Sequence, residues 1–412
     1  MQKSICIPAT PPVDISALTP LIDHPAFQAL RERRQLGINY LVFPGAVHTR
    51  FEHAIGTLAL TQRLIRIHRL DDDDALHLQA FALLHDLGHG PFSHQVEPVL
   101  RGDHHSNGIR LLETMQKQLA DVRVDFQRLS AMFTGDDPLA TWINDRNLGA
   151  DKLDYLMRDA LHIGFHGTPD IEKLQCYTYM TSEGIAIEEK FIEDAKQLQK
   201  FYSYLHQHGY LNKTALAAQR MLQRAVQEEL AGQDGDALWL MSDAQLRQWL
   251  EQAQSPLSRR LVRDLAARNL HRSFLVFKPT GYAFVERQAE KALVVMEWPR
   301  AEMRQITERL QDIDTVKHLE DQLAAAFNLS PGDLLFAAMP YFKKLIPKDL
   351  RVFSQKSNGS FWLLENDADH RRSLESDYLR TFAIRLTCPM EHRQALAAQA
   401  DAIAETLRRA IL

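Results

Sequence analysis

The sequence has few cysteines and no long run of apolar residues. Its 412 residues include only Cys6, Cys176 and Cys388, which are too few and too scattered for a disulfide framework or a thiolate metal site. No apolar stretch approaches the roughly 20 residues that a transmembrane helix needs. The N-terminus also lacks the basic and then apolar pattern of a signal peptide. We therefore expect a cytoplasmic protein with no membrane partner.

Basic charge is not in excess either. The 48 lysines and arginines are outnumbered by 53 acidic residues, which leaves a net charge of −5 at pH 7. This balance provides no global positive field, so nucleic-acid binding is not indicated. Hydrophobic residues make up 45% and charged residues 25% of the chain, as in an ordinary globular protein. The length allows two or three domains.

The order of the periodic segments predicts a mainly α-helical fold with a smaller α+β part at the C-terminus. Residues 1–20 carry four prolines and no periodicity, which predicts an arm. From residue 21 to about 270, nearly every periodic segment has helical spacing. From 271 to 412, short strand-like runs alternate with helical segments, and Asn358-Gly359 predicts a hairpin. We expect domain boundaries near residues 20 and 270.

The stretch from His85 to His94 contains three histidines and one carboxylate within ten residues. His85 and Asp86 offer an imidazole nitrogen and a carboxylate oxygen, which suit one divalent cation. Gly88 is expected to end the preceding helix in a left-handed conformation, and Pro91 to prevent the helix from resuming. A His-rich surface loop would contain the same residues, so ligands elsewhere in the chain must decide between the two interpretations.

Two further segments carry residues of the same kind. Arg50 to His53 opens a helix expected from about Thr49 to Leu70. A later helix has polar side chains at positions i, i+4, i+7 and i+8, which place them in one stripe: Asp151, Tyr155, Arg158 and Asp159. Such a stripe either faces solvent or lines a cleft, and its spacing alone does not distinguish the two.

His53, the pair His85-Asp86, and Asp151 together resemble the H…HD…D signature of the HD-domain metal-dependent phosphohydrolases. Three longer segments resemble the deoxynucleoside triphosphate triphosphohydrolase branch of that family: residues 43–53, 85–94 and 151–155. The resemblance runs through most of the helical part and, more faintly, into the C-terminal part. It implies a helical HD-domain core and one divalent ion, Mn²⁺, Fe²⁺, Mg²⁺ or Zn²⁺, with four protein ligands: His53, His85, Asp86 and Asp151.

The resemblance also implies roles for individual side chains. The catalytic steps fall to a His–acid dyad and two further histidines: His94, Glu97, His89 and His104. Eight residues are expected to contact a nucleotide substrate. Arg50 and Lys152 would contact the phosphates, and Gln35 and Leu36 would lie under the deoxyribose. Tyr155 and Asp159 would lie beyond the sugar, and His206 and Tyr210 over the nucleotide. By analogy with the family, we expect a homodimer or homotetramer.

One position departs from the family pattern. Several relatives carry an arginine for the terminal phosphates where this sequence has Tyr202, so the substrate class stays open. The preferred function is cleavage of dNTPs to deoxynucleoside and triphosphate. The alternatives are an HD phosphatase or 5′-nucleotidase acting on nucleoside monophosphates or another phosphoester, and a non-catalytic nucleotide-binding scaffold. The scaffold is least favoured, because it has no need of an aligned proton shuttle such as His94 and Glu97.

Overall fold

The computed structural model describes residues 3–411 except 234, 282–291, 339–347 and 358. Two compact units share the chain. The first draws on residues 1–205, 236–244 and 347–371, and the second on 206–235, 245–346 and 372–412. The boundary expected near residue 270 follows the order of the sequence, whereas each of these units is assembled from separate segments. Among the described residues, no helix is both long and apolar enough to cross a lipid bilayer.

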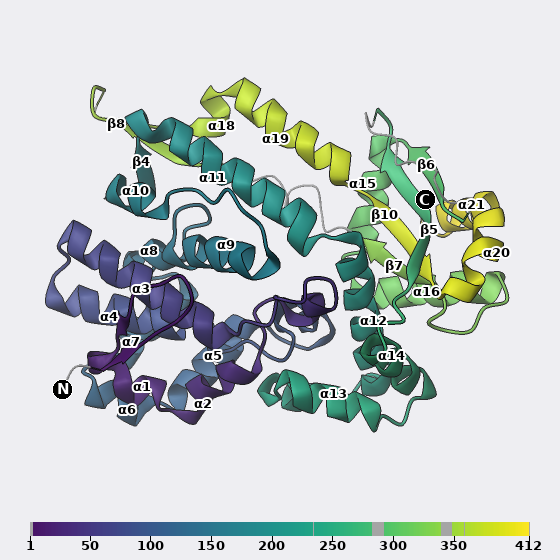
Figure 1. The fold of residues 1–412 in the computed structure, drawn as a ribbon, viewed down its shortest axis with the longest axis horizontal. Coiled ribbons are helices and arrows are strands. Elements are labelled where there is room, and N and C mark those ends of the chain that lie inside the picture. The colour runs from purple at the N-terminus through teal and green to yellow at the C-terminus, as the bar shows by residue number, and fades with distance from the viewer. Residues whose placement is uncertain (1–2, 234, 282–291, 339–347, 358, 412) are drawn as a thin grey trace. The chain divides into compact units, whose positions relative to one another are not determined.

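The first unit is mainly helical. Its central helix, α3 (Arg50–His68), packs against both α4 (Asp72–Leu84) and α9 (Ala150–Ile163) (Figure 1). The remaining helices within this unit are α1 (Thr19–Ile22), α2 (Pro25–Gln28), α5 (His104–Glu113), α6 (Gln116–Asp121), α7 (Phe126–Thr134), α8 (Thr141–Asn144), α10 (Ile171–Cys176), α11 (Ile192–Leu205) and α18 (Leu363–Asn366). The helix expected from about Thr49 is therefore confirmed.

Local capping explains where the two helices that lead to the site begin. The Thr49 hydroxyl accepts a hydrogen bond from the Glu52 amide at 3.4 Å, which caps α3. The Asp71 carboxylate accepts one from the Asp74 amide at 2.9 Å, and the first turn of α4 is acidic. Negative charge at this end is favourable because the helix dipole is positive there. The buried side chains Ile55 and Leu58 then anchor α3 in the core.

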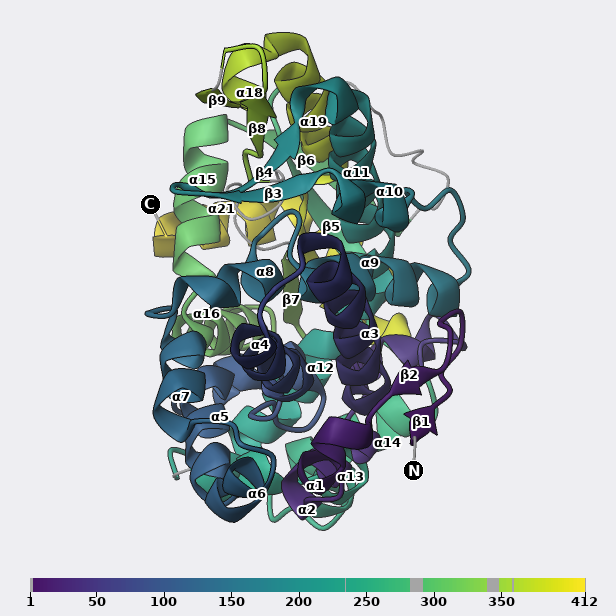
Figure 2. The same ribbon diagram turned by 90° about the vertical axis from the view of Figure 1, so that its left-hand side faces the viewer.

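A four-stranded sheet in the first unit joins distant parts of the chain. Its order is β3 (Thr178–Thr181), β4 (Gly184–Glu188), β8 (Arg351–Ser354) and β9 (Gly359–Trp362), and Figure 2 shows the four strands side by side. β4 and β8 are parallel, whereas the two outer pairs are antiparallel. The hairpin predicted at Asn358-Gly359 is found as β8 and β9, although Asn358 lies outside the described residues. A two-stranded pair, β1 (Ser4–Ile5) and β2 (Val13–Asp14), lies in the predicted arm.

The second unit has an α+β architecture. Its sheet has the order β6 (Val294–Trp298), β5 (Arg272–Pro279), β10 (Ile384–Cys388) and β7 (Leu335–Ala338). The helices of this unit are α12 (Lys213–Leu230), α14 (Pro256–Ala266), α15 (Arg300–Arg309), α16 (Ile313–Ala326), α20 (Arg393–Ala398) and α21 (Ala400–Ile411). α13 (Asp243–Glu251) and α19 (Ala368–Thr381) include residues of both units. The predicted fold class, mainly α with a smaller α+β part, is confirmed.

Candidate active site

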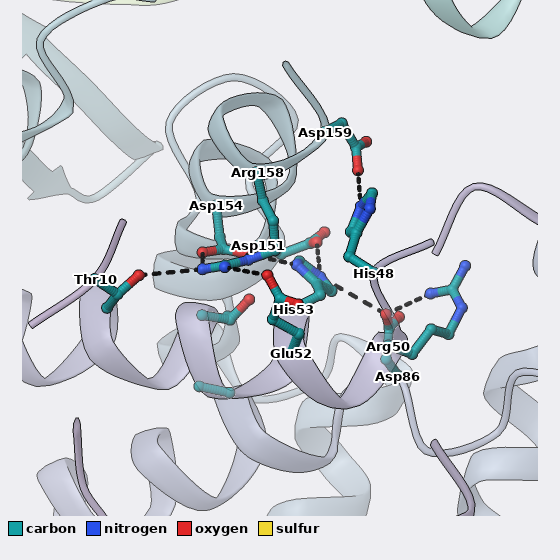
Figure 3. Close-up of polar contacts among 12 residues, drawn as sticks. Thr10, His48, Arg50, Glu52, His53, Asp86, Asp151, Asp154, Arg158 and Asp159 are labelled. Atoms are coloured by element: carbon teal, nitrogen blue, oxygen red, sulfur yellow. Dashed lines mark hydrogen bonds and ion pairs between the residues drawn. The ribbon is translucent and has the colours of Figure 1, made fainter. Parts of the chain in front are cut away.

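The four predicted metal ligands meet in the first unit, although they come from three helices. His53 lies in the first turn of α3, His85 and Asp86 directly follow α4, and Asp151 lies in the first turn of α9. The Nε2 atom of His53 is 3.1 Å from Asp151 Oδ1 and 3.6 Å from Asp86 Oδ2 (Figure 3). The Nε2 atom of His85 is 3.6 Å from Asp86 Oδ1 and 3.6 Å from Asp151 Oδ1.

The second nitrogen of each histidine is already engaged. His53 Nδ1 lies 2.8 Å from Asp154 Oδ2, and His85 Nδ1 lies 2.8 Å from the Ala82 carbonyl oxygen. Because both partners are acceptors, each Nδ1 carries a hydrogen, and each Nε2 can bind a cation once its imidazole is neutral. The Nε2 atom of His85 is buried and has no hydrogen-bond partner.

These separations fit a single divalent ion. Ligand atoms about 2.0–2.2 Å from a common ion lie about 3.0–3.6 Å from one another. Donor atoms of His53, His85 and Asp86 all lie within 4.8 Å of one another, and Asp151 Oδ1 lies 3.1 and 3.6 Å from the two histidines. The donor set of two histidines and two carboxylates suits Mn²⁺, Fe²⁺, Mg²⁺ or Zn²⁺ and does not select one of them.

Charge at the site is balanced by these same contacts. Burial alone would lower the pKa of His53, but hydrogen bonds to Asp151 and Asp154 and the nearby Asp86 charge raise it to about 10. Burial would raise the pKa of Asp86, but the positive charge of Arg50 and the neighbouring histidines lowers it well below its usual range. The metal-free protein therefore holds a proton on His53 at neutral pH, and the carboxylates are ionised.

Metal binding should release this proton. At pH 7.5 we expect uptake of one Mn²⁺ to release about one proton, because a ligating imidazole must be neutral and the pKa of His53 is about 10. The affinity for Mn²⁺ should accordingly rise with pH, about tenfold per unit where one proton is displaced, and level off near pH 10. Calorimetric titrations at one pH, in buffers of different ionisation enthalpy, measure the proton count. A binding enthalpy that is independent of the buffer would contradict the protonated state of His53.

The predicted catalytic residues form a second cluster, joined to the metal ligands. Glu97 accepts hydrogen bonds from His94 Nδ1 at 2.9 Å and from His104 Nδ1 at 2.8 Å. The rings of His89 and His104 stack with their centroids 4.0 Å apart, and His89 Nε2 is 3.1 Å from Asp86 Oδ1. His94 is the exposed member, with 64% of its side chain accessible. One carboxylate therefore orients two imidazoles beside the metal ligands.

The acidity of Glu97 follows from these contacts. Burial would raise its pKa, but the hydrogen bonds from His104 and His94 outweigh burial and lower the pKa below its usual range. Glu97 is thus an anionic anchor for His94 rather than a proton donor. The neighbouring His105 makes no hydrogen bond to Glu97 among the described contacts, which favours His104 as the member of this cluster.

The loop that carries His94 is formed by 3-10 turns and not by an α-helix. His94 and Glu97 lie in two successive 3-10 turns, Ser93–Gln95 and Glu97–Val99. The chain enters them through Phe92 and Ser93, whose φ angles of 53° and 55° are left-handed. Asp243, far away in the sequence, holds this bend because its carboxylate accepts a hydrogen bond from the Phe92 amide at 2.7 Å.

The expected left-handed conformation of Gly88 is wrong. Gly88 is not among the residues with positive φ. Glycine is required there because α5 passes close by, and a Cβ atom would collide with the His104 carbonyl oxygen and the Gly108 amide nitrogen. The Gly88 carbonyl also accepts a hydrogen bond from the Asn107 side chain at 2.7 Å. This close packing places His104 next to His89.

Replacing Gly88 by alanine should therefore destabilise the protein. Overpacking against rigid backbone typically costs about 1–3 kcal/mol, and we expect a loss of at least this size in urea unfolding. Gly359→Ala is the matched control, because the nearest atom to its Cβ would be the Ser357 hydroxyl oxygen at 3.7 Å. If both variants unfold at the wild-type urea concentration, the close approach of α5 has no energetic consequence.

The predicted phosphate ligand Arg50 is buried beside the metal ligands. Its guanidinium pairs with Asp86 through Nη1 and donates from Nε to the Ser93 hydroxyl at 2.7 Å. The Ser93 hydroxyl in turn donates to the Arg34 carbonyl at 2.8 Å. The orientation of Arg50 is thus determined before any substrate binds, and its contact with phosphate stays a prediction.

Three other predicted substrate residues lie on α9. The Lys152 ammonium is 3.6 Å from the centroid of the Tyr202 ring, and burial lowers the pKa of Lys152 to about 7 despite the nearby Asp145 and Asp151 charges. The Tyr155 ring centroid is 6.5 Å from that of His53. Asp159 accepts a hydrogen bond from His48 Nε2 at 2.7 Å and is buried (Figure 3). Tyr155 therefore borders the metal ligands, whereas Asp159 is engaged by His48.

The remaining predicted residues lie in two places. The Oε1 atom of Gln35 is buried without a hydrogen-bond partner, so it is an available acceptor for a hydroxyl group. Leu36 is buried, and its carbonyl accepts from the Gln95 side chain at 3.3 Å. His206 and Tyr210 belong to a π-helical turn of the second unit, and their role over the nucleotide stays a prediction.

Sequence reasoning placed Arg158 in a polar stripe but missed its partners, Asp154 and Glu52. Arg158 donates to both oxygens of Asp154, at 2.8 and 2.9 Å, and to Glu52 Oε1 at 2.9 Å. Glu52 Oε1 is also 2.9 Å from His162 Nε2. The i,i+4 spacing of Asp154 and Arg158 was a usable signal for the ion pair. Nothing in the local sequence of Asp243 pointed to the loop that it holds.

Residues 50–158 match the HD domain family. An uncharacterized protein of Methanocaldococcus jannaschii is 31% identical over 266 residues, which cover 62% of this chain and 56% of that protein. Deoxynucleoside triphosphate triphosphohydrolase SAMHD1 of Bos taurus is 29% identical over 244 residues, which cover 47% of this chain and 41% of that protein. The chain spans about half the length of the curated relatives it matches.

Solved structures resemble almost the whole chain. A phosphohydrolase from Bacteroides thetaiotaomicron has a TM-score of 0.70 and 21% identity, covering 94% of this chain and 99% of its own. A hypothetical protein from Aquifex aeolicus also has a TM-score of 0.70, with 19% identity and coverage of 97% and 100%. At these identities, the likeness shows a shared fold.

Proposed function

We propose that this chain, whose residues 50–158 match the HD domain family, is an HD-domain phosphohydrolase that cleaves dNTPs to deoxynucleoside and triphosphate. The proposal rests mainly on the contact between the cluster of predicted metal ligands and the cluster of predicted catalytic residues. Four metal-ligating side chains and a carboxylate-oriented histidine pair are joined by the 3.1 Å contact between His89 and Asp86. A nucleotide-binding scaffold has no use for the second cluster.

The side chains divide the work between them. His53, His85, Asp86 and Asp151 would hold a divalent ion, which would supply polarisation of a phosphate oxygen and a lower pKa for bound water. Arg50, which is always charged, is fixed by Ser93 where it can bind a phosphate oxygen.

Proton transfer falls to the exposed histidine of the second cluster. Hydrolysis at the phosphorus next to the sugar adds a water oxygen and breaks the bond to the 5′-oxygen, which must take up a proton. His94, oriented by Glu97, is placed to move that proton.

Recognition of a nucleotide sugar is supported by Gln35, although the 3′-hydroxyl is common to ribo- and deoxynucleotides. The unpaired Gln35 acceptor suits a 3′-hydroxyl, because a buried amide oxygen without a partner is costly until a donor arrives. The relative SAMHD1 bears the name of a deoxynucleoside triphosphate triphosphohydrolase. The homodimer or homotetramer expected from the family stays a prediction.

A second candidate function is hydrolysis of nucleoside monophosphates. The observation that favours it is Tyr202, whose ring carries the Lys152 ammonium at 3.6 Å. Tyr202 supplies no cation for phosphates beyond the first one, and Lys152 Nζ is engaged by the Arg146 carbonyl oxygen as well as by this ring. Weak discrimination between tri- and monophosphates would follow from it.

Product analysis decides between these candidates. The Mn²⁺-loaded protein is incubated with dNTPs, NTPs and dNMPs, and the products are separated by ion-exchange chromatography. Release of intact triphosphate from dNTPs, with little turnover of NTPs, is the expected result. Orthophosphate released only from monophosphates would establish the second candidate. No turnover of any of these compounds, by protein with full Mn²⁺ occupancy, would contradict both.

A further inference from the structure

One cavity in the first unit has no role in the proposed reaction. It has a volume of about 560 Å³ and lies between the predicted arm at residues 8–14, the helices α3 and α9, and residues 165–172. This volume is in the range of sites for small molecules, about 300–1,000 Å³. The four metal-ligand residues are not among the described residues that line it. The cavity is therefore a separate candidate for ligand binding.

One face of α3 forms a wall of the cavity. Gly56, Ala59, Leu60, Arg63 and Arg66 recur at intervals of three and four residues, which places them on one side of the helix. The helix thus presents its first turn to the metal ligands and its later turns to the cavity.

The opposite wall is largely apolar. It is lined by side chains of α9 and the following segment: Leu153, Met157, Leu161, Phe165 and Ile171. Leu161 is 48% exposed, which is unusual for a leucine in this well-packed unit. Prolines at positions 8, 11 and 12 close the cavity from the arm. A ligand with an apolar body would bury these surfaces.

Two arginines of the cavity keep donor atoms without a partner. Of the three carboxylates that line it, Glu172 is paired with Arg63 at 2.7 Å, Asp154 is paired with Arg158 at 2.8 Å, and Asp14 accepts a hydrogen bond from the Ser16 amide at 2.9 Å. The Nε atom of Arg63 is buried and has no hydrogen-bond partner. Arg66 is exposed and makes no hydrogen bond or ion pair within the described part of the chain. An acidic group on a ligand would meet both arginines.

We propose that this cavity binds a small amphipathic anion. Its acidic group lies at Arg63 and Arg66, where it satisfies the unpaired Nε donor and neutralises a free guanidinium. Its apolar body lies against Met157, Leu161 and Phe165. A neutral apolar ligand would leave the Nε donor of Arg63 buried and unpaired, and a small inorganic anion would leave the apolar wall exposed.

Hydrogen bonds connect the cavity to the metal ligands. Arg158, which lines the cavity, donates to the Pro8 carbonyl at 3.4 Å and the Thr10 hydroxyl at 3.3 Å, both in the arm. The same guanidinium donates to the Asp154 carboxylate, which also accepts a hydrogen bond from His53 Nδ1 at 2.8 Å (Figure 3). Gly56 allows this approach, because a Cβ atom there would collide with Asp154 and Arg158.

Occupancy of the cavity should therefore affect metal binding. A ligand that moves the arm changes the contacts of Arg158, and hence the hold of Asp154 on His53. If the ligand alters the affinity for metal, the metal must alter the affinity for the ligand by the same factor. Ligand binding in the cavity would thus regulate the affinity of the four predicted ligands for metal.

The first test uses a fluorescent amphipathic anion, 8-anilinonaphthalene-1-sulfonate, as the probe. We expect Arg66→Glu to weaken its binding at least tenfold, because a charge-assisted contact is replaced by repulsion. Lys117→Glu makes the same charge change on an exposed residue of α6, and should leave the dissociation constant unchanged. Leu161→Asp should weaken binding through the apolar wall. Equal probe affinity in wild type, Arg66→Glu and Leu161→Asp, all with wild-type circular dichroism, would overturn the site.

The second test measures the connection to the metal ligands without an activity assay. The probe is titrated into wild-type protein with and without saturating Mn²⁺, and we expect dissociation constants that differ about fivefold. The difference should disappear in Arg66→Glu, where the probe no longer occupies the cavity. A dissociation constant that Mn²⁺ leaves unchanged in the wild type would overturn the regulatory connection. Neither test depends on the proposed hydrolysis, so their failure is distinguishable from its failure.

Discussion

Replacement of Asp86 by asparagine should remove the divalent ion and, with it, hydrolysis. The Asp86 carboxylate faces both histidines: Oδ2 lies 3.6 Å from His53 Nε2, and Oδ1 lies 3.6 Å from His85 Nε2. Asparagine has the same shape, but its amide is neutral and is a poor ligand for a hard cation. Loss of a residue that only supports a ligand typically costs about 10–100-fold in affinity, so loss of a ligand should cost more.

Elemental analysis after purification in Mn²⁺ measures this effect. Wild type should contain one equivalent of metal and Asp86→Asn close to none, and the turnover of the variant should fall below detection. Asp401→Asn, an exposed carboxylate of the second unit, serves as the control for the loss of one negative charge. An equivalent of metal in Asp86→Asn would show that the ion is bound elsewhere.

A second large effect is expected from His94→Gln, this time on turnover alone. His94 contacts Glu97 but none of the four metal ligands, and it is largely exposed. Its loss should therefore leave both the fold and the metal content unchanged. General acid–base catalysis contributes about 10²–10⁴-fold, and kcat should decrease by this factor. Steady-state kinetics on a substrate identified by product analysis measures the change.

His105→Gln is the matched control for this experiment. His105 follows His104 in the sequence, and their ring centroids are 4.1 Å apart, yet it makes no hydrogen bond to Glu97 among the described contacts. Its turnover should remain close to that of wild type. If His94→Gln keeps wild-type kcat while His105→Gln loses activity, His105 and not His94 takes part in proton transfer.

Several features of this protein were predictable from short stretches of sequence. Capping by Thr49 and Asp71 involves residues within one helical turn, so the starts of α3 and α4 could be read locally. The resemblance to the HD-domain signature predicted His53, His85, Asp86 and Asp151 as metal ligands, and the structure brings these four side chains together. Nitrogen and oxygen donors of this kind predict a divalent metal site whatever the surrounding fold.

Other features depend on contacts between residues far apart in the chain. The pairing of β4 with β8 joins residues about 165 positions apart, so no local pattern could assign both hairpins to one sheet. Gly88 was correctly singled out, but for the wrong reason, because the approach of α5 is a tertiary contact. The hold of Asp243 on the loop that carries His94 is likewise a contact over about 150 residues.

In α3 and α9, the sequence alone determines some features, and only the tertiary structure decides others. Helical periodicity determined which of their residues share a face, because that depends on 3.6 residues per turn alone. Which face meets the metal ligands and which meets the arm was decided only when Arg158 was placed between Asp154 and Pro8. Burial of a charged group is stabilised only if all of its partners arrive together, and those partners come from three separate segments of the chain.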